Sequence, residues 1–109
     1  MTELKTANLI KGGAFLIEDI EADRVFTPED FTEEQKMIAK TTEDYVLNEV
    51  VHVIDNLENH EFEHSVRLLK KAGDLGLLGA DVPEEYGGLG LDAVSSALIT
   101  EKMSRAGGF

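Results

Sequence analysis

The chain has 109 residues, 42% of them hydrophobic and 29% charged, which fits at most one soluble domain with an ordinary core. Its 22 acidic residues outweigh 10 basic ones, and the resulting formal charge of -12 argues against binding to nucleic acid or to an anionic membrane surface. Cysteine is absent, which excludes disulfides and thiolate metal sites, and no apolar run approaches the roughly 20 residues of a membrane-spanning helix.

The first 24 residues lack both the long apolar stretch of a secretory signal and the arginine bias of a transit peptide, so we expect a cytoplasmic protein. Residues 9–17 are apolar but are interrupted by two glycines. This pattern predicts an extended arm that docks through three side chains, with a frayed terminus as the alternative. The three are Phe15, Leu16 and Ile17.

A long helix is predicted to follow a short turn. Thr27-Pro28-Glu29-Asp30 has a capping hydroxyl, proline at the first helical position and acids near the positive dipole end, and Thr32-Glu33-Glu34-Gln35 has the spacing of a capping box. Residues expected to face the core then recur at helical spacing, and polar residues lie opposite them. The apolar stripe is Ile38, Thr42, Tyr45, Val46, Val50, Val53 and Leu57, and Lys40, Asp44, Asn48 and Asp55 lie opposite.

Two further helices are predicted. The polar stretch from Asn56 to Glu61 ends the first helix, and the second ends where Gly76 supplies a C-terminal cap. The third begins with Asp92 as its N-cap and ends at Gly107-Gly108. The expected buried stripes are Phe62, Val66, Leu69, Ala72 and Leu75 in the second helix, and Val94, Ala97, Leu98 and Met103 in the third.

The connector Gly76–Asp92 lies between these two helices and contains five of the ten glycines and one of the two prolines. Such a segment cannot form a continuous helix or a central strand. Leucine, valine and tyrosine are interleaved through it, whereas a flexible linker would carry serine and charge. We therefore predict a packed connector of specific shape, longer than most helix connections and for that reason functional or interface-forming.

His60-Glu61-Phe62-Glu63-His64 matches the His-Glu-x-x-His pattern, in which two histidines one helical turn apart bind zinc and the glutamate activates water. A catalytic zinc needs a third ligand, yet no histidine or cysteine follows His64, which leaves carboxylates and the earlier His52. The motif also lies among charged residues, without an apolar shell. We interpret these residues as exposed residues at a helix start, with a zinc hydrolase as a distant alternative.

Two weaker patterns are explained structurally. Gly88-Leu89-Gly90-Leu91-Asp92-Ala93 resembles part of a dinucleotide fingerprint, but that motif follows a β-strand, and a turn with a helix cap accounts for the same residues. Glu101 lies four residues after Ala97 and seven after Val94, so helical geometry places it on or beside the buried stripe. A structural hydrogen bond or a position at the edge of the stripe is favoured there over catalysis.

The order of residues in the connector is similar to that of a known family. Leu75-Gly76-Leu77-Leu78-Gly79, the segment from Val82 to Leu91 with its Pro-Glu-Glu-Tyr-Gly-Gly core, and the later Leu98-Ile99-Thr100-Glu101 closely resemble the N-terminal region of acyl-CoA dehydrogenases. The resemblance covers about residues 26–109. The segment around Lys11-Gly12-Gly13-Ala14-Phe15 is similar to N-terminal extensions of longer-chain members.

The resemblance implies an all-α fold, part of the N-terminal helical domain of an acyl-CoA dehydrogenase, with about three main helices and an N-terminal arm. It divides the chain into an arm at residues 1–25 and an incomplete helical domain at 26–109, without the middle β domain and the C-terminal helical domain. The resemblance implies that, as in most members, the catalytic glutamate lies in the C-terminal domain and FAD is held mainly by the middle and C-terminal domains. We therefore assign no catalytic, cofactor-binding or metal residue, and expect no FAD on this fragment.

The parent implied by the resemblance is an FAD-dependent flavoprotein of fatty acid β-oxidation that oxidises a fatty acyl-CoA to the trans-2-enoyl-CoA. Its expected partners are the acyl-CoA substrate, an electron-transfer flavoprotein and further copies of itself. We expect the fragment to be inactive and, because helix faces would be left bare, to self-associate. The alternative is a self-contained acidic helical module that binds another protein.

Overall fold

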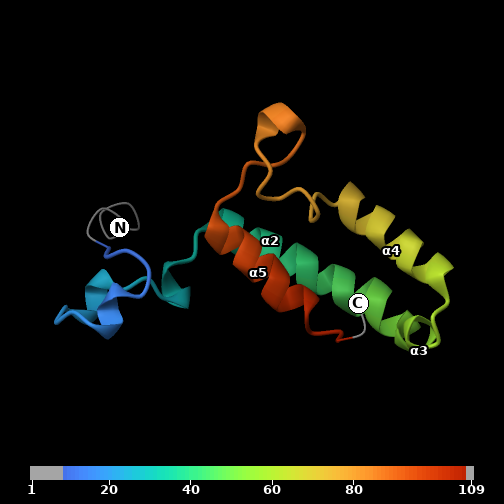
Figure 1. Cartoon of the computed structure of the whole chain (residues 1–109), viewed down its shortest axis with the longest axis horizontal. Coiled ribbons are helices and arrows are strands. Elements are labelled where there is room, and N and C mark those ends of the chain that lie inside the picture. Colours follow the sequence, from blue (N-terminus) through green and yellow to red (C-terminus); the bar gives the residue numbers. More distant parts are fainter. Residues whose placement is uncertain (1–8, 108–109) are drawn as a thin grey trace. The chain divides into compact units, whose positions relative to one another are not determined.

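The computed structural model describes residues 9–107, and within that range it contains helices and turns but no β-strand (Figure 1). The all-α prediction is thus confirmed for these residues. The chain falls into two compact units that divide after Glu33, and each is described by itself. Residues 1–8 of the predicted arm, and Gly108 of the predicted helix stop, lie outside the described range.

The N-terminal unit is a series of short 3-10 turns, at Ala14–Leu16, Ala22–Arg24 and Pro28–Asp30. The prediction of an extended arm was therefore wrong, because local hydrogen bonds such as Leu16 N–H to the Gly13 carbonyl (2.9 Å) curl the segment. The predicted turn at Thr27 is confirmed. Its backbone N–H donates to Asp30 Oδ2 at 2.9 Å, and Pro28 occupies the first position of the turn.

The predicted long helix begins as expected but is not regular. Helix α2 spans Glu33–Tyr45, a π-helical segment follows at Val46–Val50, a 3-10 turn at Val51–Val53, and helix α3 at Ile54–Glu58. The interruption coincides with a cluster of valines, whose β-branched side chains crowd the preceding helical turn. The predicted stripe nevertheless faces the core: Thr42, Tyr45, Val46 and Val50 are buried, and Ile38, Val53 and Leu57 pack against them.

Helix α4 spans Phe62–Asp74 and ends at the predicted glycine cap. Gly76 has a φ of +83°, its N–H donates to the Gly73 carbonyl at 3.0 Å, and the Leu77 N–H donates to the Ala72 carbonyl at 3.0 Å. These two bonds form the Schellman arrangement, which satisfies carbonyls that the helix end would leave unpaired.

The predicted buried stripe of α4 was mostly wrong. Ala72 is buried, but Phe62, Val66 and Leu69 are 68%, 51% and 48% exposed, and Leu75 is also exposed. Leu68 is the fully buried leucine instead. The helix is turned so that Leu68 and Ala72, four residues apart, face the core, and a row of large apolar side chains is left on the surface.

Helix α5 spans Ala93–Met103, so it stops before the predicted Gly107. Leu98 is buried as predicted, and Val94 and Met103 are half-buried, but Ala97 is exposed, and Ser95 and Ile99 are buried in its place. In Figure 1, α5 runs alongside α2, and Glu43 on α2 joins the two helices. Its carboxylate contacts Arg105 at 3.1 Å and Lys102 at 3.8 Å.

The core of the second unit is contributed by α2, the π-helical segment, α4, the connector and α5. The Tyr45 hydroxyl, buried against α4, donates to the Leu68 carbonyl at 2.7 Å, and burial raises the pKa of this phenol. The core residues are Tyr45, Val46, Val50, Leu68, Ala72, Leu77, Ala80, Ile99 and Ala106. No helix within residues 9–107 is long and apolar enough to cross a membrane.

Candidate functional site

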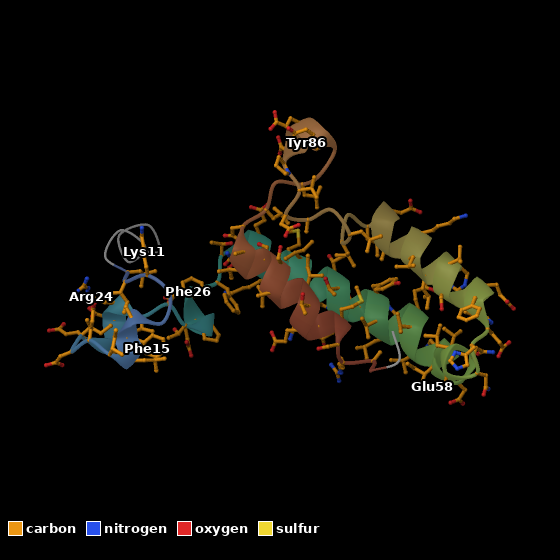
Figure 2. The ribbon with its side chains drawn as sticks, in the orientation of Figure 1. Lys11, Phe15, Arg24, Phe26, Glu58 and Tyr86 are labelled. Carbon is orange, nitrogen blue, oxygen red and sulfur yellow. The ribbon has the colours of Figure 1, made fainter. Side chains whose placement is uncertain are left out.

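The connector between α4 and α5 is a closed loop with a fixed shape. Its two arms are joined by backbone hydrogen bonds from the Leu89 N–H to the Gly79 carbonyl (3.0 Å) and from the Leu91 N–H to the Ala80 carbonyl (2.7 Å). Leu77 and Ala80 are buried in the core. The prediction of a packed connector of specific shape is confirmed for this base, whereas Tyr86 at the tip of the loop is 76% exposed (Figure 2).

Gly88 is the position at which the closed loop tolerates no side chain. A Cβ atom built there would overlap the Val82 carbonyl oxygen and the Val82 side chain. Any other residue would push the two arms apart and weaken the neighbouring bond from the Gly90 N–H to the Val82 carbonyl, which is 2.8 Å long. The glycine therefore serves loop closure, as the turn interpretation of this glycine-rich stretch requires.

Asp92 joins the connector to both neighbouring helices. Its Oδ1 accepts a hydrogen bond from the Ser95 N–H at 2.9 Å, which confirms the predicted N-cap of α5, and its Oδ2 accepts one from Gln35 Nε2 at 3.0 Å. The backbone hydrogen bond from Ser95 is the main cause of the lowered pKa of Asp92. Because this carboxylate already occupies the helix N-terminus, the dinucleotide-like glycines do not present a free phosphate site there.

Two apolar grooves lie beside the connector. One has a volume of about 420 Å³ and is lined on one side by Leu77 and Leu78 and on the other by α5 and the turn after it, through Ile99, Thr100, Met103, Ser104, Ala106 and Gly107. The other, of about 290 Å³, lies between α2 and the connector and is lined by Glu34, Met37, Ile38, Thr41, Leu75, Leu89 and Leu91. Glu34 is the single ionisable side chain in these two linings, so the grooves suit apolar contact rather than acid–base chemistry.

The His-Glu-x-x-His residues do not share one helix. Helix α4 begins at Phe62, and His60 precedes it with a φ of +60°, so the two histidines lack the one-turn spacing that the zinc motif needs. His60 instead contacts the Phe62 ring, with centroids 6.0 Å apart. His52, on the 3-10 turn after the π-helical segment, is exposed.

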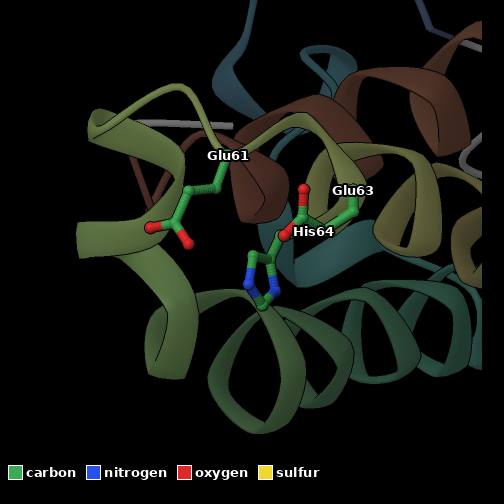
Figure 3. Close-up of side chains that lie close together, drawn as sticks. All are labelled: Glu61, Glu63 and His64. Carbon is green, nitrogen blue, oxygen red and sulfur yellow. The ribbon is translucent and has the colours of Figure 1, made fainter.

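One group of possible metal ligands does form at the start of α4, from Glu61, Glu63 and His64 (Figure 3). Their ligand atoms lie within 4.8 Å of one another, and Asn56 Nδ2 donates to Glu61 Oε2 at 3.0 Å. Glu63 is exposed and the other two are half-buried, so the group lacks the enclosing apolar shell that orients ligands in catalytic metal sites. We assign no metal to it.

Glu101 is exposed, so of its two predicted positions the structure agrees with the edge of the stripe and not with the buried face. The reason is the orientation of α5, in which Ala97 also faces solvent. Sequence reasoning missed the buried Gln35, which is 6% exposed and bonded to Asp92 across 57 residues of chain. A polar residue in the first turn of an amphipathic helix gives no sequence signal of such a long-range partner.

Comparisons with known proteins agree with this architecture. A family model described as "Acyl-CoA dehydrogenase, N-terminal domain" matches residues 32–109. The chain belongs to the acyl-CoA dehydrogenase family. The resemblance drawn from the connector is thereby confirmed, and the all-α fold is that of the family's N-terminal helical domain.

The chain is 73% identical over 105 residues to a probable acyl-CoA dehydrogenase of Bacillus subtilis, a match that covers 96% of this chain and 18% of the relative. It is 34% identical over 82 residues to the mitochondrial short-chain specific acyl-CoA dehydrogenase of Mus musculus, covering 75% of this chain and 20% of the relative.

Among solved structures, the acyl-CoA dehydrogenase of Bacillus anthracis complexed with FAD matches with a TM-score of 0.82 and 70% identity, covering 89% of this chain and 17% of that one. The chain thus spans about a fifth of the length of these relatives.

Proposed function

We propose that this chain is the front part of the N-terminal helical domain of an FAD-dependent acyl-CoA dehydrogenase. The observation that carries the proposal is the family match over residues 32–109 together with a chain that spans about a fifth of its relatives. The solved relative from Bacillus anthracis is complexed with FAD, which supports FAD in the parent. Residues 1–25 are then its arm, and residues 26–109 are an incomplete domain.

The parent's proposed reaction is oxidation of a fatty acyl-CoA to the trans-2-enoyl-CoA in fatty acid β-oxidation. A base removes a proton from the α carbon, and a hydride leaves the β carbon. Bound FAD would be the oxidant that accepts this hydride, so that the substrate loses two hydrogens and the cofactor is reduced by two electrons. We further propose that an electron-transfer flavoprotein takes up the electrons, that the parent is a homo-oligomer, and that it acts in the cytoplasm.

The residues described here do not fit FAD on their own. The N-terminus of α5 is already capped by Asp92, and the two connector grooves contain no basic side chain that could pair with a pyrophosphate. The role of this chain in the parent is therefore structural: it supplies a helical framework and apolar surfaces. We propose that the isolated chain binds no FAD and is inactive.

The test compares the full-length parent with the 109-residue chain. The purified parent should be yellow, and anaerobic addition of a saturated acyl-CoA should bleach its flavin absorbance and yield a product two hydrogens lighter. The isolated chain should be colourless. A parent without flavin, or one that does not respond to acyl-CoA, would refute the proposed activity, and stoichiometric flavin on the isolated chain would refute its inability to hold FAD.

A second candidate is a self-contained acidic module that binds another protein, favoured by the row of exposed apolar side chains on α4. The source gene distinguishes the two. A reading frame that continues beyond Phe109 into a β domain supports the dehydrogenase, whereas one that ends there supports the module.

A further inference from the structure

Residues 10–24 of the N-terminal unit form a closed loop. The Ile10 N–H donates to the Arg24 carbonyl at 3.1 Å, which joins the two ends of the loop. Within it, the Ala14 N–H donates to the Lys11 carbonyl at 3.2 Å and the Glu18 N–H to the Ala14 carbonyl at 3.0 Å. Compact loops of this length with joined ends are frequently functional.

The loop presents an apolar tip to solvent. Phe15, Leu16 and Ile17 are 45%, 76% and 88% exposed. Phe15, labelled in Figure 2, and Leu16 belong to a 3-10 turn, and Ile17 directly follows it. Four acidic residues follow within the same loop: Glu18, Asp19, Glu21 and Asp23. Three adjacent large apolar side chains on one turn are more than the scattered apolar exposure of an ordinary surface, so they indicate a contact site.

The match to the Bacillus subtilis relative includes this loop, and the family model does not. A match over 105 of 109 residues cannot omit residues 10–24, so the Bacillus subtilis relative contains the loop. By contrast, the family model begins at residue 32, and the match to the mouse short-chain enzyme extends over only 82 residues.

The fraction of each relative that is covered by its match also gives the length of that relative. A 105-residue match that is 18% of the Bacillus subtilis relative puts that protein at about 580 residues, and an 82-residue match that is 20% of the mouse enzyme puts that one at about 410. The difference, about 170 residues, is enough for a further domain, and the loop accounts for only a small part of it.

We propose that the tip formed by Phe15, Leu16 and Ile17 docks into an apolar pocket, bordered by basic side chains, on the additional region of the longer dehydrogenases. This proposal rests on the proposed function, because it requires a full-length parent of the longer kind. Because the loop lies outside the family model, the surfaces shared across the family do not require it. The four acids outnumber Lys11 and Arg24 in the same loop, so a partner with basic side chains would complement the net negative charge.

Two other binding partners for the tip are disfavoured by its charge. An anionic bilayer would repel the acids next to the tip. A second copy of the loop would bring two sets of these acids together, and like charges in apposition oppose association.

The test uses the full-length parent with p-benzoylphenylalanine in place of Leu16, irradiated and mapped by mass spectrometry. We expect cross-links from Leu16→p-benzoylphenylalanine to peptides of the additional region that carry lysine or arginine. A matched control places the same group at Leu78, which is 58% exposed on the connector in the other unit, and this variant should give a different set of peptides. Cross-links from position 16 to family-shared domains, to a second copy or to added lipid vesicles alone would overturn the proposal.

A second measurement does not depend on cross-linking. The variant F15S/L16S/I17S should expose the additional region to protease and raise its cleavage rate by about tenfold or more, because undocked elements open more readily. An unchanged cleavage rate would contradict docking. Flavin content and acyl-CoA bleaching are measured on the same samples, so a yellow, active parent with no position-16 cross-link refutes the docking alone, and a colourless parent refutes the proposed function.

Discussion

Asp92 is the side chain on which the start of α5 depends, because its two oxygens serve Ser95 and Gln35 at once. Asp92→Ala removes the cap and leaves the buried Gln35 amide without this partner. We expect a loss of about 1 to 2 kcal/mol in the free energy of unfolding, measured by urea denaturation of the 109-residue chain. Asp92→Asn retains an accepting oxygen for the cap and should lose less; equal losses for both variants would argue against capping.

The same residue predicts a pH dependence. The pKa of Asp92 is lowered from its ordinary value of 3.8, chiefly by the Ser95 backbone N–H. A carboxylate with a depressed folded-state pKa stabilises the fold above the unfolded pKa, and this contribution disappears as the pH falls through the folded pKa. The stability difference between wild type and Asp92→Asn should therefore be constant above about pH 5 and shrink below pH 3.8. A difference that did not change with pH would contradict it.

Alanine substitutions at two glycines should change the stability of the chain in opposite directions. Gly88→Ala places a methyl group against Val82 and should cost about 1 to 3 kcal/mol, as overpacking does. Gly73→Ala lies within α4 and meets only the Leu78 side chain at an ordinary 3.6 Å, so it should stabilise the chain by about 0.5 to 1 kcal/mol. Thermal unfolding of both variants checks the signs, and two changes of the same sign would contradict this account.

Residue patterns predicted local chemistry well. The Asp92 cap, the Gly76 cap and the turn at Thr27 each depend on neighbours within a few positions, and the sequence shows those neighbours directly. Gln35 and the exposure of Glu101 could not be predicted, because both depend on how α5 is rotated against the rest of the unit.

At the scale of elements, two adjacent leucines test which face of α4 packs against the core. Leu68 is fully buried, and Leu69, which periodicity placed in the core, is 48% exposed. Leu68→Ala should cost about 2 to 5 kcal/mol in the free energy of unfolding because it leaves a cavity, and Leu69→Ala should cost well under half as much. Equal costs in urea denaturation would mean that α4 packs by the predicted stripe after all.

The positions of the helices along the sequence were predictable. The side of a helix that faces the core, and the breaks in regular helical geometry, were less predictable. An amphipathic pattern marks α2 and α4 clearly, yet α4 has apolar residues on two sides, so the pattern alone does not select the side that meets Tyr45. The π-helical break at Val46–Val50 leaves the stripe intact, which is why periodicity did not reveal it. The turn at Ala14–Leu16 escaped prediction because the two glycines before it permit several backbone paths.

At the scale of the whole molecule, exposed apolar side chains oppose a high net charge. Phe62, Val66 and Leu69 favour self-association of the isolated chain, and the formal charge of -12 opposes it. We expect the mass from light scattering to rise with protein concentration and to rise further with salt, which screens repulsion. The double variant F62S/L69S should reduce this association, with Lys70→Ser as the control on the same helix. A monomer at all concentrations and salt levels would contradict it.

The hydrogen bonds between helices also set an order of folding events. Tyr45 and Leu68 are 23 residues apart, whereas Gln35 and Asp92 are separated by 57, so the second contact closes a longer loop and costs more chain entropy. The pairing of α2 with α4 should therefore form early, and docking of α5 should come last. Tyr45→Phe should then slow folding, whereas Gln35→Ala should chiefly speed unfolding. During synthesis on a ribosome, Gln35 at the start of α2 could form its hydrogen bond with Asp92 only after the connector had been synthesised.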